Sequence, residues 1–168
     1  IELELASAKE YRQEHGSCLF CDMLKEELAD GRRVIFQNEH FTVFLPFFTE
    51  YPYGVYIMSN RHCQNIAEFT PEERISFAAT LRETVGMLDS LFGFKFPYMM
   101  CMHNAPVNGE DTSGYYHFHV EFFPPMRSAD KIKFNASSET GVWAHCNPTC
   151  PEETAEELRQ AYRRFTGK

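Results

Sequence analysis

The alternation of hydrophobic and polar positions predicts five strands. Short apolar runs, rich in β-branched and aromatic residues, are separated by turn-forming residues in the first and the second half of the chain. The five predicted strands are Val34–Phe36, Phe41–Leu45, Val55–Met58, Tyr98–Met102 and Tyr116–Phe123. A long stretch of turn formers, His103–Gly114, connects the last two, and long loops of this kind are often functional.

Helical patterns flank and interrupt these strands. A mostly polar helix is expected over 3–15, ending at Gly16, and a second over Asp22–Leu28. The sequence Thr70-Pro71-Glu72-Glu73 is a capping box with proline at the first helical position. It begins a long helix whose apolar stripe is predicted at Ile75, Ala78, Leu81, Val85, Leu88 and Leu91. A last helix begins near Pro151, with Ala155, Leu158, Tyr162 and Phe165 along one side.

This order of elements predicts one α+β domain over residues 1–168. We expect an antiparallel sheet of about five strands with helices packed on one of its faces. The 168 residues are enough for a substantial core, and no internal repeat or linker divides them.

Charge and composition narrow the function. The net charge of −8 argues against non-specific nucleic-acid binding, so an anionic ligand would need local cations or a metal. No apolar stretch approaches the length of a membrane span, and no signal peptide opens the chain, which begins without Met as a fragment or processed product would. Its six cysteines are expected to be reduced, buried or metal-bound, in a cytoplasmic protein.

The run His117-Phe-His-Val-Glu121 holds the most informative chemistry. In a strand, His117, His119 and Glu121 project from one face, and Phe118, Val120 and Phe122 pack into the core. Two imidazoles and a carboxylate at this spacing suit either metal binding or phosphoryl chemistry.

His103 extends this constellation. It ends the strand expected to pair with the His117–Glu121 strand, so pairing would bring three histidines together. Zinc or iron would suit these ligands, and Glu121 is a candidate fourth. The alternative is a set of ordinary polar residues on the solvent face of a half-exposed sheet.

Two other groups have weaker signals. Cys18-x-x-Cys21 places two thiols within reach of one zinc, with His62 as a distant partner; the alternative is a free, partly buried pair. Lys131 and Lys133 follow the histidine strand and could contact phosphate, although a solvated loop explains them equally well.

Several motifs resemble one family, in order and spacing, from about Glu4 to Arg164. They are Glu27–Gly31, Phe96–Tyr98, His103–Gly109, His117–Pro125, Glu139–Gly141 and Asn147–Glu153. The chain is similar to the C-terminal half of the galactose-1-phosphate uridylyltransferases, members of the histidine-triad superfamily. The resemblance implies a histidine-triad-like fold.

The resemblance also implies an activity for the full protein. Such enzymes exchange UMP between UDP-glucose and galactose 1-phosphate in the Leloir pathway, through a histidine of a His-Pro-His motif in the N-terminal half. That motif is absent here, so the chain by itself is expected to be inactive. The full enzyme is expected to be a homodimer.

Site residues follow from the resemblance as well. The second half of the family carries iron or zinc on one Glu and three His, which here implies Glu4, His103, His117 and His119. The segment after the histidine strand holds the sugar and phosphate, often in the partner subunit's active site. This implies substrate contacts from Lys133, Phe134 and Glu139.

One departure from the family creates a conflict. By analogy with a zinc site in the first half, Cys18, Cys21, His62 and His117 would form a second zinc site. The two sites would compete for His117.

Two other functions remain open. The chain could be a stand-alone histidine-triad nucleotidyl transferase or hydrolase that uses His119 as its nucleophile. Alternatively, it could be a non-enzymatic metal-binding module.

Overall fold

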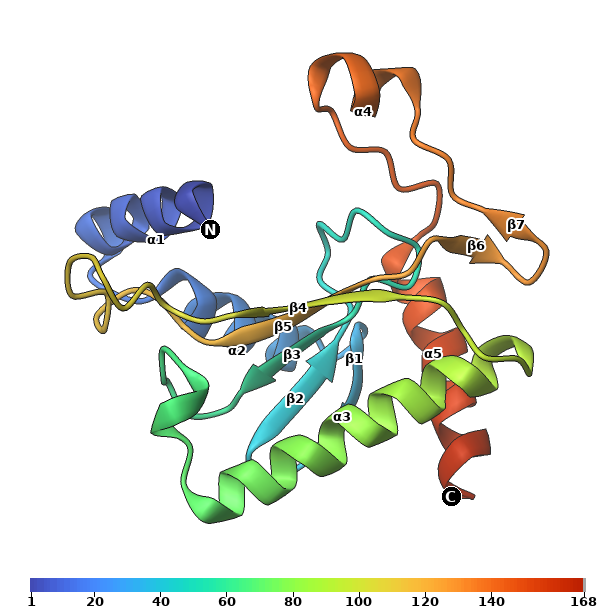
Figure 1. The fold of residues 1–168 in the computed structure, drawn as a ribbon, viewed down its shortest axis with the longest axis horizontal. Helices are drawn as coiled ribbons and strands as arrows, with labels where there is room; N and C mark the ends of the chain where they lie inside the picture. The colour runs from blue at the N-terminus through green and yellow to red at the C-terminus, as the bar shows by residue number, and fades with distance from the viewer. Residues whose placement is uncertain (168) are drawn as a thin grey trace.

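The structure, a computed structural model, describes residues 1–167, so Lys168 lies outside it. Its elements, coloured along the chain in Figure 1, are α1 (Glu2–His15), α2 (Leu19–Asp30), β1 (Val34–Gln37), β2 (Phe41–Phe44), β3 (Tyr56–Ser59), η1 (Ile66–Glu68), α3 (Pro71–Phe92), β4 (Met99–His103), β5 (His119–Phe123), β6 (Met126–Ser128), β7 (Lys131–Ile132), α4 (Ser137–Val142) and α5 (Pro151–Thr166). No helix in this part of the chain is both long and apolar enough to cross a membrane.

The predicted five-stranded antiparallel sheet is confirmed. Its strand order is β1-β2-β3-β5-β4, and every neighbouring pair is antiparallel. β5 therefore lies inside the sheet, between β3 and β4, where both of its edges are paired. This placement puts the His117–Glu121 run at the centre of the domain.

A separate arm follows the sheet. β6 and β7 form a two-stranded ribbon, and α4 lies beyond it, away from the sheet (Figure 1). Sequence patterns predicted neither the ribbon nor α4. Both are too short for hydrophobic periodicity to reveal them, because a six-residue helix spans fewer than two turns.

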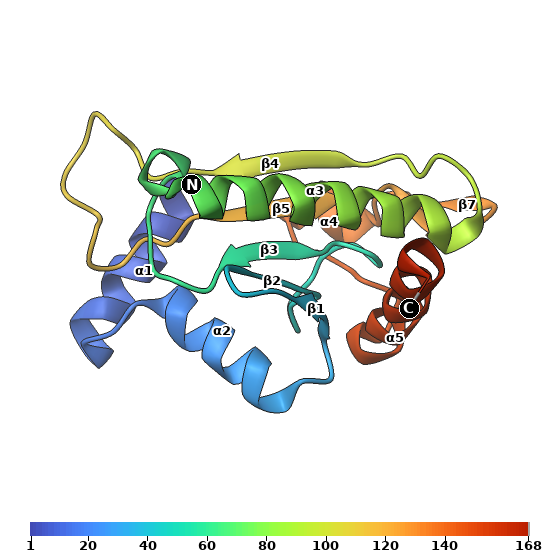
Figure 2. The same cartoon turned by 90° about the horizontal axis from the view of Figure 1, so that it is seen from below.

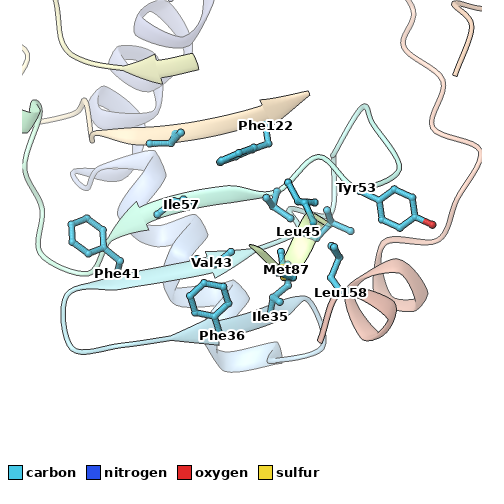
Figure 3. Close-up of a cluster of buried hydrophobic side chains, with 14 of the residues drawn as sticks. Ile35, Phe36, Phe41, Val43, Leu45, Tyr53, Ile57, Met87, Phe122 and Leu158 are labelled. Atoms are coloured by element: carbon cyan, nitrogen blue, oxygen red, sulfur yellow. The ribbon is translucent and has the colours of Figure 1, made fainter. Parts of the chain in front are cut away.

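The main core lies between one face of the sheet and helices α3 and α5. Strand residues at alternate positions, including Phe118, Val120 and Phe122, pack against these helices with less than 2% of their surface exposed. Leu158 of α5 and Met87 of α3 are fully buried in this cluster (Figure 3). The prediction that Phe118, Val120 and Phe122 face the core is confirmed.

Helices cover both faces of the sheet, so the prediction of helices on one face is wrong. A second core joins α1 and α2 to the opposite face, through residues such as Phe20, Leu24, Phe44, Met58 and Tyr116. Figure 2 shows α2 and α3 on opposite sides of the sheet. The sequence concealed this second core because His119 and Glu121 lie on the same face of the sheet and suggested a solvent-exposed face.

The long helix α3 begins as predicted but faces the core differently. Thr70 Oγ1 accepts from the Glu73 amide at 3.2 Å, and the Glu73 carboxylate accepts from the Thr70 amide at 2.8 Å. The predicted apolar stripe is partly wrong, since Ile75 is 73% exposed and Ala78 is exposed. The most buried positions are Glu73, Phe77, Thr80, Thr84, Met87 and Leu88.

Candidate metal centre

Strand register brings the histidines together. His103 of β4 lies directly opposite His119 of β5, and Cys101 lies opposite Glu121. Directly opposed residues of an antiparallel pair share a face, so His103, His119 and Glu121 all point toward α1 and α2. The expectation that strand pairing brings His103 close to this face is confirmed.

The first cluster consists of Glu4, His103, His119 and Glu121, whose ligand atoms lie within 4.8 Å of one another. Helix α1 supplies Glu4, whose carboxylate lies 3.0 Å from His103 Nδ1 and 3.6 Å from His119 Nε2. Glu121 approaches His119 Nε2 at 3.2 Å and His103 Nε2 at 3.8 Å. Two carboxylates thus converge on the two imidazoles.

Mutual pairing sets the protonation of this cluster. Burial opposes a charge on His119, but hydrogen bonds to Glu121 and Glu4 outweigh it and raise the pKa to about 9. Burial alone would raise the pKa of each carboxyl, whereas their hydrogen bonds to the histidines lower the pKa of both Glu4 and Glu121. The carboxylates are therefore ionised at neutral pH, as metal ligands must be.

The second cluster consists of Cys18, Cys21, His62 and His117, again with ligand atoms within 4.8 Å of one another. Cys21 Sγ lies 3.1 Å from His62 Nδ1 and 3.4 Å from His117 Nδ1. Cys18 precedes α2 and Cys21 lies in its first turn, while His62 comes from the loop after β3 and His117 from the segment before β5. Three distant pieces of chain meet here.

Burial and the cysteine pair shift the pKa values in this second cluster. Removal from water, with His62 nearby, lowers the pKa of His117 to about 3, so its imidazole is neutral. A hydrogen bond from Cys21 lowers the pKa of Cys18 to about 5, and the same contact raises the pKa of Cys21. One thiolate is already favoured in this geometry.

The structure distributes the expected ligands differently from the sequence prediction. It places Glu4, His103 and His119 together, but His117 lies in the other cluster, with Cys21 and His62. Glu121, favoured by spacing but not by the resemblance, occupies the fourth position beside Glu4. The conflict over His117 disappears because each cluster has four side chains of its own.

The residues expected to bind substrate lie in the arm. Lys133 Nζ pairs with Glu139 at 2.6 Å and lies 5.1 Å from the centre of the Tyr51 ring, and both charged side chains are 5% exposed. Phe134 is 82% exposed. The structure therefore joins Lys133 to Glu139 and leaves Phe134 outside that pair.

Glu139 is held in place by the arm itself. Its carboxylate accepts the Lys133 hydrogen bond and those from the Ala136 and Cys146 amides, which together lower its pKa to about 2. Because the Glu139 carboxylate accepts all three hydrogen bonds, it holds the surrounding turn of the arm in place.

Sequence reasoning missed the groups that orient these ligands. Tyr116 donates to Glu4 at 3.2 Å, and Ser59 contacts His117 Nε2 at 2.8 Å. His119 Nδ1 lies 2.9 Å from the carbonyl oxygen of His117. No local motif marks such contacts, because they join residues distant in the chain or involve the backbone.

A cavity of about 630 Å³ opens beside the first cluster. Side chains of α1 and α2 and the aromatic residues Phe47 and Phe48 form its walls, and Glu4 and Glu121 belong to its lining. Phe47 is 65% exposed and Phe48 44%. In the sequence, the high density of aromatic residues at 41–56 is the feature that corresponds to this apolar wall.

Relatives of known name share this sequence. The family described as galactose-1-phosphate uridyl transferase, C-terminal domain, matches residues 4–160. Galactose-1-phosphate uridylyltransferase of Thermotoga maritima is 42% identical over 95% of this chain and 50% of its own length. The protein of the same name from Rattus norvegicus is 33% identical over 93% of this chain and 42% of its own length.

Solved structures agree with these relatives. A uridylyltransferase structure superposes with a TM-score of 0.89 at 34% identity, over 97% of this chain and 50% of that one. A Zn-bound histidine triad family protein from Mycobacterium smegmatis has a TM-score of 0.57 at 18% identity, over 90% and 96% of the two chains, and shows the shared fold. The chain spans about half the length of the curated relatives it matches. It belongs to the family of galactose-1-phosphate uridylyltransferase C-terminal domains.

Proposed function

We propose that this chain serves as the C-terminal half of an enzyme that exchanges UMP between UDP-glucose and galactose 1-phosphate. In this role it holds a metal on Glu4, His103, His119 and Glu121 and contributes sugar-phosphate contacts from its arm. The observation that carries the proposal is the buried four-ligand cluster in a chain that matches this family over residues 4–160.

The donor set fits a metal. Two imidazoles and two carboxylates, with ligand atoms within 4.8 Å of one another, are ligands that both zinc and iron accept. A bound cation would neutralise the two carboxylates and link α1 to the sheet. Phe20 and Tyr56 flank the His119 ring at 4.9 and 5.5 Å, and Tyr116 restrains Glu4, so the ligands are held in orientation before binding.

The geometry does not favour His119 as a nucleophile, the first alternative function. Its side chain has no exposed surface, and Nε2 faces the carboxylates of Glu4 and Glu121. A nucleotide phosphate would have to approach two negative charges, which oppose its binding. We infer that His119 is a ligand, and that the nucleophile is supplied elsewhere in the full enzyme.

The arm supports the proposed substrate contacts. It extends away from the sheet (Figure 1) and carries the exposed Phe134 beside the Lys133–Glu139 pair. The Lys133 ammonium is paired with Glu139 here, so a sugar phosphate would share this cation with Glu139 or take its place. An arm of this shape could reach an active site outside its own domain, which accords with the predicted homodimer.

A chimera tests the proposal. This chain would replace the C-terminal half of the Thermotoga maritima relative, which is 42% identical to it. We expect UMP exchange from the chimera and none from the chain by itself. Lys133→Met in the chimera should raise the KM for the hexose phosphate about tenfold or more, as expected for the loss of a charged hydrogen bond worth about 1.5–3 kcal/mol. Lys131→Met, at an exposed position of β7, is the matched control.

Two results would overturn the proposal. One is a chimera that folds, by circular dichroism and gel filtration, yet exchanges no UMP. The other is turnover by the chain itself with a nucleotidyl adduct on His119, detected by intact-protein mass spectrometry, which would support the stand-alone enzyme. If the chimera binds metal but Lys133→Met leaves its kinetics unchanged, the result would favour the alternative function, a non-enzymatic metal-binding module. The cytoplasmic location remains a prediction.

A further inference from the structure

We infer that Cys18, Cys21, His62 and His117 form a closed, structural zinc site, separate from the carboxylate cluster. This goes beyond the proposed function, which does not use the site. Binding would release the Cys21 thiol proton, and any proton still on Cys18, into solvent, and two thiolates would balance the charge of the cation.

The distances match zinc coordination. A tetrahedral zinc with Zn–S of about 2.3 Å and Zn–N of about 2.0 Å separates sulfur from nitrogen by about 3.5 Å. Cys21 Sγ lies 3.1 and 3.4 Å from the Nδ1 atoms of His62 and His117, and all four ligand atoms lie within 4.8 Å of one another. A cation therefore fits among them with small adjustments.

Both imidazoles turn Nδ1 toward the site, and an outer contact at Nε2 holds each ring in this orientation. His62 Nε2 lies 2.8 Å from the Ser113 carbonyl oxygen, which only accepts, so Nε2 carries the proton and a neutral His62 presents the Nδ1 lone pair to Cys21. His117 Nε2 contacts the Ser59 hydroxyl at 2.8 Å, and its Nδ1 faces the same sulfur. Such outer hydrogen bonds are typical of metal-binding histidines.

The position of the cysteines favours thiolates. Cys18 is the N-cap of α2 and Cys21 lies in its first turn, where the helix dipole stabilises negative charge. Cys18 Sγ now lies 3.2 Å from the Tyr115 carbonyl oxygen, a contact that metal binding would replace.

The arrangement indicates a structural rather than a catalytic metal. All four ligands come from the protein, so no position is open for water or substrate. They join the start of α2 to the loop after β3 and to the segment before β5. Sulfur ligands select zinc over magnesium or calcium, whereas the carboxylate cluster has no sulfur and accepts harder metals.

Cobalt substitution tests the site in the unmodified chain. The metal-free chain titrated with Co²⁺ should develop a thiolate-to-cobalt charge-transfer band, with the strong visible bands of tetrahedral cobalt. X-ray absorption at the zinc edge should show sulfur neighbours at about 2.3 Å as well as lighter ones at about 2.0 Å. Absence of the thiolate band or of the sulfur shell would overturn the inference without any variant having to fold.

Variants separate the two clusters. Cys21→Ser should abolish the cobalt–thiolate band and remove one equivalent of tightly bound zinc, measured by mass spectrometry of the metal. Cys101→Ser, at an exposed cysteine of β4, is the matched control and should keep both. Glu121→Gln should weaken the other cluster and leave the thiolate band unchanged. A single metal lost in both Cys21→Ser and Glu121→Gln would overturn the inference, because it would show one shared site.

Discussion

His117 and His119 are only two residues apart, yet they belong to different clusters. His117 lies in the segment before β5, whereas His119 begins the strand. His117 reaches Cys21 of α2, and His119 reaches Glu4 of α1. The identity of each cluster therefore depends on which helix covers which end of the strand.

At this scale the two carboxylates of the first cluster can be tested separately. Glu121→Gln and Glu4→Gln keep the side-chain size but remove one anionic ligand each. We expect each variant to lower zinc affinity by at least tenfold, the lower end of the loss seen even for outer-shell partners of a metal site. Competition with a chromogenic chelator measures this.

The control for these variants is Glu10→Gln, on the exposed surface of α1. It should bind metal as the unmodified chain does. Unchanged affinity in Glu121→Gln, with a loss in Glu4→Gln, would show that Glu121 only orients His119 and is not a ligand.

Among the elements, α3 depends on a capping box reinforced from outside the helix. Arg61 donates to both carboxylate oxygens of Glu73 at 2.8 Å, while that carboxylate also accepts from the Thr70 amide. The Arg61 hydrogen bond lowers the pKa of Glu73 to about 2. The start of α3 is therefore tied to the loop that carries His62.

Glu73→Gln should lower the free energy of unfolding by about 1 kcal/mol at pH 7, the usual contribution of a helix cap. The ion pair with Arg61 adds little to this value, because Arg61 is half exposed and solvent screens its charge. The folded pKa lies below the ordinary value of 4.5, so the stabilisation from ionised Glu73 is complete above about pH 4.5. It is lost as the pH falls toward 2. The difference between variant and unmodified chain should therefore shrink in acid, as measured by urea unfolding between pH 7 and pH 3.

Glu72→Gln is the matched control for this pH series. Glu72 lies in the same first turn, where a negative charge near the helix start is worth about 0.3–1 kcal/mol, but it has no arginine partner. A Glu73→Gln penalty that stays constant down to pH 3 would contradict the assignment of the low pKa to Glu73.

At the level of the whole molecule, the sheet separates two cores of different strength. The α3–α5 side buries a large aliphatic and aromatic cluster (Figure 3), whereas α1 has a single fully buried residue, Ala8. Helix α1 is attached mainly by polar contacts, including Glu4 to His103 and Lys9 to Glu110 at 2.7 Å. The N-terminal helices should thus be the least stable part of the domain.

Removal of metal should expose this difference. After chelation, we expect amides of α1 and the first turn of α2 to lose protection from hydrogen exchange, because each proposed site joins one of these helices to the sheet. Amides of α3 should keep theirs, since that helix has no ligand. Hydrogen exchange read by mass spectrometry, with metal restored as the control, measures this. Equal loss of protection in α3 would indicate global rather than local unfolding.

Local chemistry made much of this domain predictable. Strand alternation placed His119 and Glu121 opposite Phe118 and Val120, since side chains of a strand must alternate, and the Thr70 capping box located the start of α3. The resemblance to the family, carried by short motifs, extended from about Glu4 to Arg164. These features depend on residues close in sequence, whose geometry the backbone itself dictates.

Only tertiary structure decided what those residues contact. The partition of His117 and His119 between clusters, and the presence of Glu4 beside Glu121, depend on how α1 and α2 pack on the sheet. That packing results from long-range burial, which no local pattern encodes. The sequence by itself therefore determined the strand and its candidate ligands, whereas the covering helices determined that they form two clusters instead of one.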